Sequence, residues 1–261
     1  MAELDGLLLD NVAKAATAAK RIGVLTGAGV SAESGVPTFR EAQTGLWAKH
    51  DPVMLASIEG FTADPANVWK WYDERRQTMR AVDPNPGHYA LAEWENEWRG
   101  RGHSFQLMTQ NIDDLHGRSG STEIIELHGN IWLVRRMNAP IHESFRLDDC
   151  PIPEIPPRDE EGNLLRPHVV WFGEQLDHQV LQSAFDYAST CDFMIVAGTS
   201  SVVYPAAAIP YEAKRRGATV VEVNPNPTDL TRFADFAISA PSGEAIPELW
   251  SRVKKLCGDS D

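Results

Sequence analysis

The sequence has few cysteines. Only three occur in 261 residues, Cys150, Cys191 and Cys257, and they lie far apart along the chain. An odd number of widely spaced cysteines argues against a disulfide framework and favours a reducing compartment, so we expect a cytoplasmic protein. The N-terminus lacks the basic start of a signal peptide, and no apolar run approaches the roughly 18 residues that span a bilayer. We therefore expect no membrane partner.

Positive charge is also scarce. Lysine and arginine number 24 against 37 aspartates and glutamates, which gives a formal net charge of −13. Such an acidic chain is poorly suited to nucleic acid or an anionic membrane, so neither is expected as the main partner. The hydrophobic content of 43% is sufficient for a core. At this length the chain can form one large α/β domain, or a large domain that carries a small insert.

Apolar runs alternate with segments of helical character along the chain. Strands that are apolar throughout and alternate with helices predict a parallel sheet covered on both faces, so we expect an α/β, Rossmann-like fold. The expected strands are 22–25, 105–109, 123–127, 193–197 and 218–223, and the expected helices are 7–20, 65–80, 86–98 and 204–216. Around a main domain of residues 1–40, 81–134 and 168–261, we expect a helical excursion at 41–80 and a small inserted module or loop at 135–167.

A glycine-rich motif follows the first apolar run. Gly27-x-Gly29-x-x-Ala32 fits the G-x-G-x-x-G/A pattern of a dinucleotide fold. The first glycine permits a tight turn, the second lets a pyrophosphate approach the backbone, and N–H groups of the next helix would face the phosphates. Gly35-x-Pro37 then forces the chain out of that helix into a loop.

Polar residues also follow the other predicted strands. Any one such cluster is explained by a turn or a helix cap, and for Asn224-Pro225 a turn would be the simplest explanation. Five clusters at equivalent topological positions indicate a ligand-binding edge, because open α/β sheets bind ligands at the carboxyl ends of their strands. The clusters are Thr26–Gly29, Thr109–Asp113, Leu127–Gly129, Gly198–Ser200 and Asn224–Asn226.

Together these motifs resemble the sirtuins, the NAD-dependent lysine deacylases. The resemblance covers nearly the whole chain and rests on six motifs in family order and spacing: Gly27–Arg40, Thr109–His116, Glu126–Gly129, Arg166–Glu174, Gly198–Ala207 and Asn224. Thr38 within the first motif, together with Gly198–Pro205, is similar to the class III-like branch that favours acidic acyl groups.

The resemblance implies NAD as cofactor and a role for each matching residue. Phe39 and Arg40 would lie on a mobile loop over the cofactor, and Gln110, Asn111 and Asp113 would hold the nicotinamide ribose and the carboxamide. The residues implied to bind NAD are Gly27, Ala28, Gly29, Ser31, Thr38, Phe39, Arg40, Gln110, Asn111, Ile112, Asp113, Gly198, Thr199, Ser200, Asn224, Pro225, Asn226 and Ser242.

The catalytic residues implied are His128, as general base, with Asn111 and Asp113. In sirtuin chemistry the acyl-lysine oxygen attacks C1′ of the nicotinamide ribose as nicotinamide leaves, and a histidine then takes a ribose hydroxyl proton. A histidine pKa of about 6.5 suits that task. The products would be nicotinamide, O-acyl-ADP-ribose and deacylated lysine. His116 is expected to be structural and to hold the loop that bears Asp113.

Acyl selectivity is expected to depend on Tyr72 and Arg75. The two stand at i and i+3 of a predicted helix and so share a face. A phenol and a guanidinium there could bind the carboxylate of a succinyl, malonyl or glutaryl chain, which predicts a desuccinylase or demalonylase with weaker deacetylase activity. An acyl-lysine protein or peptide, the expected partner, would pair as an extended strand with segments that contain Val170, Trp171, Phe172, Gly173, Glu174, Val203 and Tyr204. Trp171 and Phe172 would line the acyl tunnel, although plain core packing is an equal interpretation.

The chain departs from the family pattern in its inserted module. Most sirtuins bind a structural zinc there with two Cys-x-x-Cys pairs. Here the corresponding positions are approximately Arg136, Ala139, Arg158 and Glu161, and Cys150 is the only cysteine of the module. One thiolate cannot make a tetrahedral site, even with His142, Asp148 and Asp149 nearby, so we expect no zinc and no other metal. Charge pairs of Arg136 or Arg158 with Glu161 could replace it.

Two other functions remain open at this stage. An NAD glycohydrolase or ADP-ribosyltransferase would keep the cofactor and change the acceptor, but neither needs an acyl-lysine tunnel. A non-catalytic NAD or ADP-ribose sensor would need no base, which the retention of His128 disfavours. Nicotinamide release that depends on an acyl-peptide would separate these alternatives from a deacylase.

Overall fold

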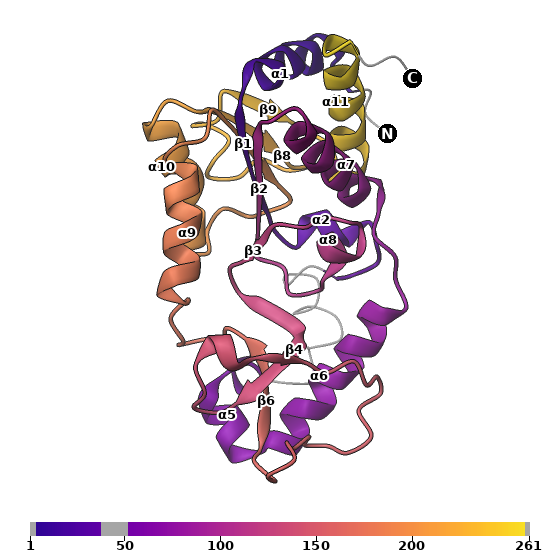
Figure 1. Ribbon diagram of the computed structural model, residues 1–261, viewed down its shortest axis with the longest axis vertical. Helices are drawn as coiled ribbons and strands as arrows, with labels where there is room; N and C mark the ends of the chain where they lie inside the picture. Colours follow the sequence, from indigo (N-terminus) through magenta and orange to yellow (C-terminus); the bar gives the residue numbers. More distant parts are fainter. Residues whose placement is uncertain (1–3, 38–51, 259–261) are drawn as a thin grey trace.

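The computed structural model describes residues 4–37 and 52–258. Its main feature is a six-stranded parallel sheet in the order β3-β2-β1-β7-β8-β9 (Figure 1). This arrangement confirms the predicted α/β, Rossmann-like fold. The strands are β1 (Arg21–Thr26), β2 (Ser104–Thr109), β3 (Ile124–Glu126), β7 (Phe193–Ala197), β8 (Thr219–Val223) and β9 (Phe236–Ile238).

Helices cover both faces of this sheet, because alternate strand residues point to opposite sides. Ile195 packs into one buried cluster, with side chains of α1 (Gly6–Ala18), α7 (Pro86–Gly100) and α11 (Ser242–Leu256). Its neighbour Val196 packs into another, with side chains of α9 (His178–Ala188) and α10 (Ile209–Arg215). Figure 1 shows α9 and α10 on one side of the strands, with α7 and α11 on the other.

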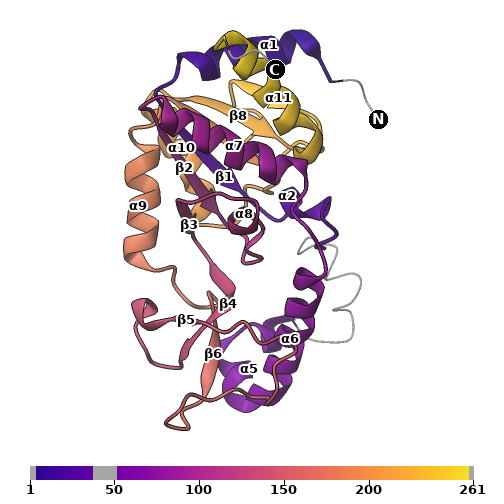
Figure 2. The same ribbon diagram turned by 45° about the vertical axis from the view of Figure 1, so that its right-hand side comes forward.

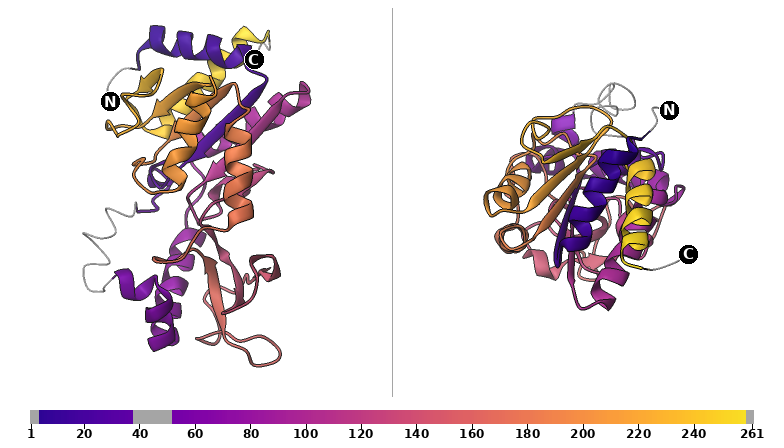
Figure 3. Two further views of the ribbon diagram at one scale, coloured as in Figure 1. Left: turned by 90° about the vertical axis from the view of Figure 1, so that its left-hand side faces the viewer. Right: turned by 90° about the horizontal axis from the view of Figure 1, so that it is seen from above.

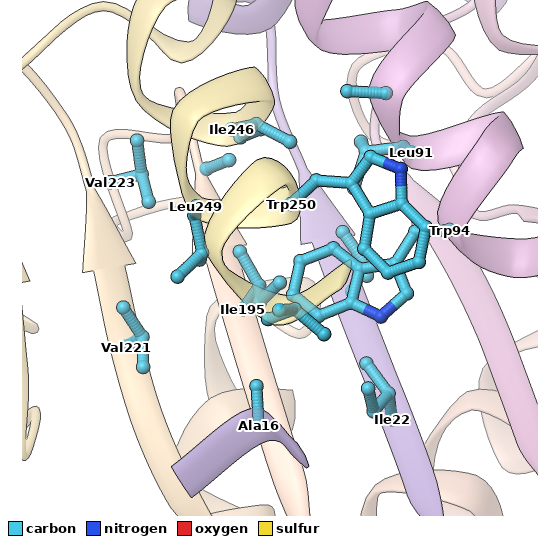
Figure 4. Close-up of a cluster of buried hydrophobic side chains, with 14 of the residues drawn as sticks. Ala16, Ile22, Leu91, Trp94, Ile195, Val221, Val223, Ile246, Leu249 and Trp250 are labelled. Atoms are coloured by element: carbon cyan, nitrogen blue, oxygen red, sulfur yellow. The ribbon is translucent and has the colours of Figure 1, made fainter. Parts of the chain in front are cut away.

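Tryptophans fill the larger of these two clusters. Trp94 of α7 and Trp250 of α11 stack with ring centroids 5.2 Å apart and planes 21° apart (Figure 4). Both rings are buried, and they belong to the same cluster as Ile195 and Val221 of the sheet. Aromatic pairs of this kind contribute about 0.5–1.5 kcal/mol beyond the area they bury, so this contact ties the two helices to each other.

A second, smaller part of the molecule lies beyond the carboxyl edge of the sheet (Figure 2). It combines α4 (Pro52–Leu55), α5 (Ile58–Ala63) and α6 (Pro65–Arg80) with an antiparallel sheet in the order β5-β4-β6. Its strands are β4 (Gly129–Arg136), β5 (Phe145–Arg146) and β6 (Leu165–Val169). The helices and strands lie side by side (Figure 3, left) and share one apolar core. The helical excursion and the inserted module, expected as separate segments, therefore stabilise each other.

The predicted helix 65–80 and strand 193–197 have the expected bounds, most other predicted elements differ by one or two residues at an end, and one predicted helix is divided. Helix α6 begins at Pro65, where the Asp64 side chain accepts from the Asn67 N–H over 3.0 Å, and ends at Arg80 as predicted. The expected helix 204–216 is divided into a 3-10 turn, η2 (Ala206–Ala208), and α10. Pro210 explains the division, since proline has no N–H to continue a helix and suits the first turn of a new one.

The remaining helices and strands were given no bounds in the sequence analysis. These are α2 (Gly29–Ala32), α8 (Leu115–Arg118), η1 (Ile141–Glu143), and α4, α5, α9, α11, β4, β5, β6 and β9. No described helix is long and apolar enough to cross a membrane.

Candidate functional site

The predicted polar clusters all lie at the carboxyl edge of the main sheet. They follow β1, β2, β3, β7 and β8, which are neighbours in the strand order. Strand β1 stands between β2 and β7. The strands that follow β1 in sequence, β2 and β3, lie on one side of it, and the later strands β7, β8 and β9 lie on the other, so the strand order reverses at β1. Ligands of doubly wound sheets bind at such a switch point. In Figure 1, β4 leaves this same edge and runs toward α6.

Three glycines let the loops after β1 and β7 touch. The Gly29 N–H donates to the Gly198 carbonyl over 2.7 Å, and a Cβ on Gly29 would lie 2.7 Å from that oxygen. A Cβ on Gly27 would lie 2.8 Å from the Thr199 Cβ. The glycines are thus required for packing between the two loops, in addition to the predicted close approach of a pyrophosphate to the backbone.

Other predicted residues of this motif are Ala28, Thr38, Phe39 and Arg40. Ala28 precedes α2, which is a single turn, whereas Thr38, Phe39 and Arg40 lie outside the described residues.

Thr199 joins the loops after three strands. Its hydroxyl accepts from Gln110 Nε2 over 3.0 Å, and its carbonyl accepts from Asn224 Nδ2 over 2.9 Å. Asn224 Oδ1 in turn accepts from the Asn226 N–H over 3.1 Å, which fixes the turn through Pro225. The structure therefore brings together residues that the sequence places 89 and 25 positions apart.

Two further predicted NAD residues differ in exposure. Ser200 is exposed, whereas Ser242 at the start of α11 is buried. Within the described part of the chain the Ser242 Oγ has no hydrogen-bond partner. Its neighbour Gly243 donates its N–H to the Glu33 carboxylate over 2.7 Å, so the start of α11 is held against the end of α2. A buried hydroxyl without a partner fits a bound ligand at this end of the edge.

A hydrogen-bonded chain fixes the predicted catalytic pair Asn111 and Asp113. Asn111 Nδ2 donates to the Ser31 Oγ over 3.0 Å, and that hydroxyl donates to Asp113 Oδ2 over 2.7 Å. Asp113 Oδ1 accepts from the Leu115 N–H over 2.9 Å. Burial raises the pKa of Asp113, and these two donors oppose the rise. Between the pair, the Ile112 carbonyl accepts from the Ile131 N–H of β4, so the loop is tied to the smaller part.

His128 lies between β3 and β4, and a hydrogen bond fixes which of its ring nitrogens carries the proton. Its Nδ1 is 2.9 Å from the Gln110 carbonyl, and a carbonyl can only accept, so Nδ1 carries the proton. Nε2 then holds a lone pair. Burial lowers the pKa of His128, and the bond to Gln110 opposes this. The ring is therefore neutral near pH 7 with a basic nitrogen available, which is the state that a general base requires.

His116 has a different environment, as expected for a structural residue. It is buried, and its Nε2 lies 2.9 Å from the Thr26 Oγ at the end of β1. The Thr26 hydroxyl donates to Thr109, so it accepts from His116. Burial lowers the pKa of His116 well below its usual value, and the ring packs 4.7 Å from that of His88. A neutral His116 thus anchors the start of α8 to the sheet.

Tyr72 and Arg75 extend from α6 toward the Asp113 loop. Tyr72 is 2% exposed, and its hydroxyl oxygen accepts from Trp171 Nε1 over 2.9 Å. The Arg75 guanidinium lies 4.7 Å from the centre of the Trp71 ring. Burial lowers the pKa of Arg75, while the charges of Tyr72 and Asp113 raise it. The phenol, the cation and the buried carboxylate are therefore within electrostatic range of one another.

Comparison with known proteins agrees with this geometry. Residues 27–205 match the Sir2 family. The chain belongs to the Sir2 family. It is 46% identical over 246 residues to "NAD-dependent protein deacylase 2" of Pyrobaculum aerophilum, covering 94% of this chain and 96% of the relative. The predicted sirtuin family and the predicted kind of enzyme, an NAD-dependent protein deacylase, are confirmed.

Solved sirtuin structures share the whole fold. A Sir2 homologue solved as an NAD complex is 44% identical to this chain. The two structures align with a TM-score of 0.85, and the alignment covers 97% of this chain and 95% of the other. A second, described as bound to a myristoylated histone peptide, is 33% identical, with a TM-score of 0.78 over 98% and 100% of the two chains. NAD complexes of such close homologues support NAD as the cofactor of this sirtuin.

The segments predicted to bind peptide combine fixed and exposed groups. The Val170 N–H donates to the His128 carbonyl over 2.9 Å, which attaches the segment directly to the predicted general base. Phe172, Val203 and Tyr204 expose 49%, 47% and 68% of their surface, whereas Trp171 is buried. Of the amides at 170–174, that of Gly173 alone donates no hydrogen bond within residues 4–37 and 52–258.

Sequence reasoning missed what the Glu174 side chain does. It was expected only as part of the peptide-pairing segment, yet its carboxylate forms a bidentate ion pair with Arg166, at 2.6 and 2.8 Å. Arg166 is 1% exposed. The sequence did contain an indication of this ion pair: Arg166 and Glu174 stand eight residues apart and flank a mostly apolar segment. A charge expected to be buried there needs a partner of opposite charge.

The inserted module of this sirtuin contains the expected ion pair and one more. Arg136 donates to Glu161 over 3.0 Å, as hypothesised, and also to Asp159 over 2.5 Å, which was not foreseen. Arg158 instead donates to the Gly162 carbonyl. Near the remaining zinc-equivalent position, the Ala139 carbonyl accepts from Arg135. Among the described residues no group of three or more His, Cys, Asp or Glu side chains could hold a metal ion.

Proposed function

We propose that this sirtuin removes acidic acyl groups, succinyl and malonyl, from lysine in preference to acetyl. The observation that carries the proposal is the pair on α6: the buried Tyr72 phenol and the Arg75 guanidinium, which lies within electrostatic range of both Tyr72 and Asp113. The planar guanidinium of an arginine binds a carboxylate through two parallel hydrogen bonds, so the carboxylate at the end of a succinyl or malonyl chain would suit Arg75. The arginine fork and the phenol hydroxyl can donate to the same carboxylate.

The carboxyl edge of the main sheet fits NAD. Donors and backbone for a dinucleotide are supplied by the Ser242 hydroxyl, which has no partner among the described residues, by the glycine loops after β1 and β7, and by the Gln110–Thr199–Asn224 network. When bound, NAD supplies the ADP-ribosyl acceptor for the acyl group. Asn111, Ser31 and Asp113 would orient the nicotinamide ribose, because their hydrogen bonds hold them in one arrangement.

His128 is proposed as the general base. Its Nδ1–H is held by Gln110, so Nε2 is the atom that would accept a ribose hydroxyl proton. The lowered pKa keeps that nitrogen unprotonated at neutral pH, and a positioned base of this kind contributes about 10²- to 10⁴-fold to rate. The proposed products are nicotinamide, O-acyl-ADP-ribose and deacylated lysine.

The proposed partner is an acyl-lysine protein or peptide in extended form. The Gly173 amide, which donates no hydrogen bond to the described residues, and the exposed Val203 and Tyr204 side chains support backbone pairing with modest side-chain recognition. The similar structure with a myristoylated histone peptide also supports a peptide substrate. An acidic protein such as this one would not be expected to act on nucleic acid.

We also propose that the inserted module works without zinc. Its only cysteine is Cys150, and Arg136 bridges two acidic side chains of the β-turn region that follows. A structural zinc needs four ligands in tetrahedral geometry, which this set of residues does not supply.

The experiment that tests the function compares one peptide carrying acetyl-, succinyl- or malonyl-lysine, with kcat/KM measured by NAD-dependent nicotinamide release. The wild type should prefer the acidic acyl groups, and Arg75→Met should lose that preference. Lys70→Met is the matched control, because Lys70 is an exposed cation of the same helix. An acetyl preference that Arg75→Met leaves unchanged would make the protein an ordinary deacetylase.

A further inference from the structure

The Tyr72 hydroxyl is oriented by a neighbour that can only donate. Trp171 Nε1 lies 2.9 Å from the Tyr72 oxygen, and an indole N–H has no acceptor capacity. The tyrosine oxygen must therefore accept this bond and keep its own hydrogen for another partner. Within residues 4–37 and 52–258 that hydrogen is donated to no protein atom. Burial raises the pKa of Tyr72 to about 12, so the hydrogen stays in place at neutral pH.

The Trp171 indole is held in turn by Arg166. The guanidinium carbon lies 3.6 Å from the centre of the Trp171 ring, which is a close cation–π contact. Phe61 packs against the same ring with centroids 5.1 Å apart. Because the guanidinium is planar and fully buried, the ring stacked on it has little freedom to rotate.

Glu174 fixes both the guanidinium and the backbone of that tryptophan. Its two carboxylate oxygens accept from Arg166, at 2.6 and 2.8 Å, and Oε2 also accepts from the Trp171 N–H over 2.8 Å. Arg166 completes its bonds with the Val169 carbonyl over 3.0 Å and the Pro167 carbonyl over 3.3 Å. The glutamate side chain thus faces inward and has no need of the peptide to satisfy it.

We propose that Glu174 and Arg166 are positioning residues for acyl selection, which act through the Trp171 indole to aim the Tyr72 hydroxyl at the substrate carboxylate. This inference rests on the proposed function, since it concerns the same acyl pocket. Neither residue needs to touch the acyl group. Their ion pair sets the ring, the ring sets the direction in which the tyrosine can donate, and that hydrogen bond discriminates between an acyl chain with a carboxylate and one without.

The test measures KM and kcat for succinyl- and acetyl-lysine forms of one peptide, with wild type, Glu174→Gln and Trp171→Phe. A hydrogen bond to a charged group is expected to matter by about tenfold or more, so the succinyl kcat/KM should fall about tenfold further than the acetyl value, mainly through KM. Glu160→Gln is the matched control, an exposed glutamate of the same part of the chain. Thermal unfolding of each variant shows whether it is folded, and Trp171→Phe keeps the test usable if Glu174→Gln is not.

A double-mutant cycle separates positioning from general structural support. If Glu174 acts through Tyr72, Glu174→Gln should lower the succinyl-to-acetyl ratio in the wild type but not further in Tyr72→Phe. Equal losses on both peptides, or additive losses in the cycle, would overturn the inference while leaving a succinyl preference of the wild type intact. A wild type without succinyl preference would overturn the proposed function, and this inference with it.

Discussion

The His128 Nδ1 donates to the Gln110 carbonyl over 2.9 Å, so one of the residues proposed to bind NAD assigns the tautomer of the proposed general base. Gln110 also donates to Thr199 through its side chain. Base orientation and cofactor recognition therefore share one residue of the loop after β2.

His128→Ala should lower the deacylation kcat by about 10²- to 10⁴-fold, because the proposed general base is lost. NAD affinity, measured by calorimetry, should change little. His142→Gln, an exposed histidine of the inserted module, is the control. Retention of more than a tenth of wild-type kcat in His128→Ala would contradict the assignment.

The pH profile of kcat/KM should show a rising limb with a pKa below about 6.5. Burial lowers the pKa of His128, and the neutral ring is the active form, so activity is lost as the pH falls through that lowered value and is full above it. The measurement is a profile between about pH 5 and pH 8 under subsaturating substrate. An inflection above 7 on the acid side would show that another group controls the reaction.

Ser31→Ala should destabilise the protein by about 1–3 kcal/mol and raise the KM for NAD, because the buried Asp113 carboxylate and the Asn111 amide both lose a partner. Urea unfolding and initial-rate kinetics measure the two effects. Ser144→Ala, outside this chain of hydrogen bonds, serves as the comparison. Unchanged KM and stability would show that the chain does not fix the loop.

Gly29→Ala should disrupt the contact between the loops after β1 and β7, because the new Cβ would lie 2.7 Å from a backbone oxygen that cannot rotate away. We expect a lower melting temperature and weaker NAD binding together. Gly100→Ala is the matched control, since nothing lies within 4 Å of its Cβ position. That helical change should be neutral or stabilising by roughly 0.5–1 kcal/mol. Normal NAD binding by Gly29→Ala would show that the loops can separate without cost.

The Arg136 ion pairs should stabilise the inserted module, and Asp159→Asn should lower the melting temperature more than Arg158→Gln. Arg136 and Asn163 hold the pKa of Asp159 at about 2. Because this folded-state pKa lies below the usual value, the contribution is present above about pH 4 and is lost as the pH falls toward 2. Metal analysis of the purified protein should find no stoichiometric zinc. One zinc per chain would refute the zinc-free proposal.

The sequence predicts the main sheet well because its strands are continuous apolar runs, and Phe193–Ala197 was recovered to the residue. It also predicts which residues gather at the carboxyl edge, since parallel topology alone brings them there. What it does not predict are side-chain partners. That Ser31 bridges Asn111 and Asp113, or that Glu174 turns inward to Arg166, depends on packing between segments distant in the chain.

The smaller part of the molecule is the least predictable from sequence. Residues 135–167 have little hydrophobic periodicity, and most of them form the irregular connection between β4 and β6. These two strands pair with each other across that long connection, and this pairing is not visible in the local sequence. The ion pair between Arg136 and Asp159 also links residues that are distant in the sequence. The arginine was therefore anticipated from the sequence, but this aspartate was missed.

The most direct test of the central claim is product analysis by mass spectrometry after incubation with NAD and a succinyl-lysine peptide. The account predicts equal amounts of nicotinamide, O-succinyl-ADP-ribose and free-lysine peptide, with none of them formed from unmodified peptide. Nicotinamide released without an acyl-peptide would indicate a glycohydrolase or transferase, and no release with any acyl-peptide would indicate a sensor; either result would contradict the account.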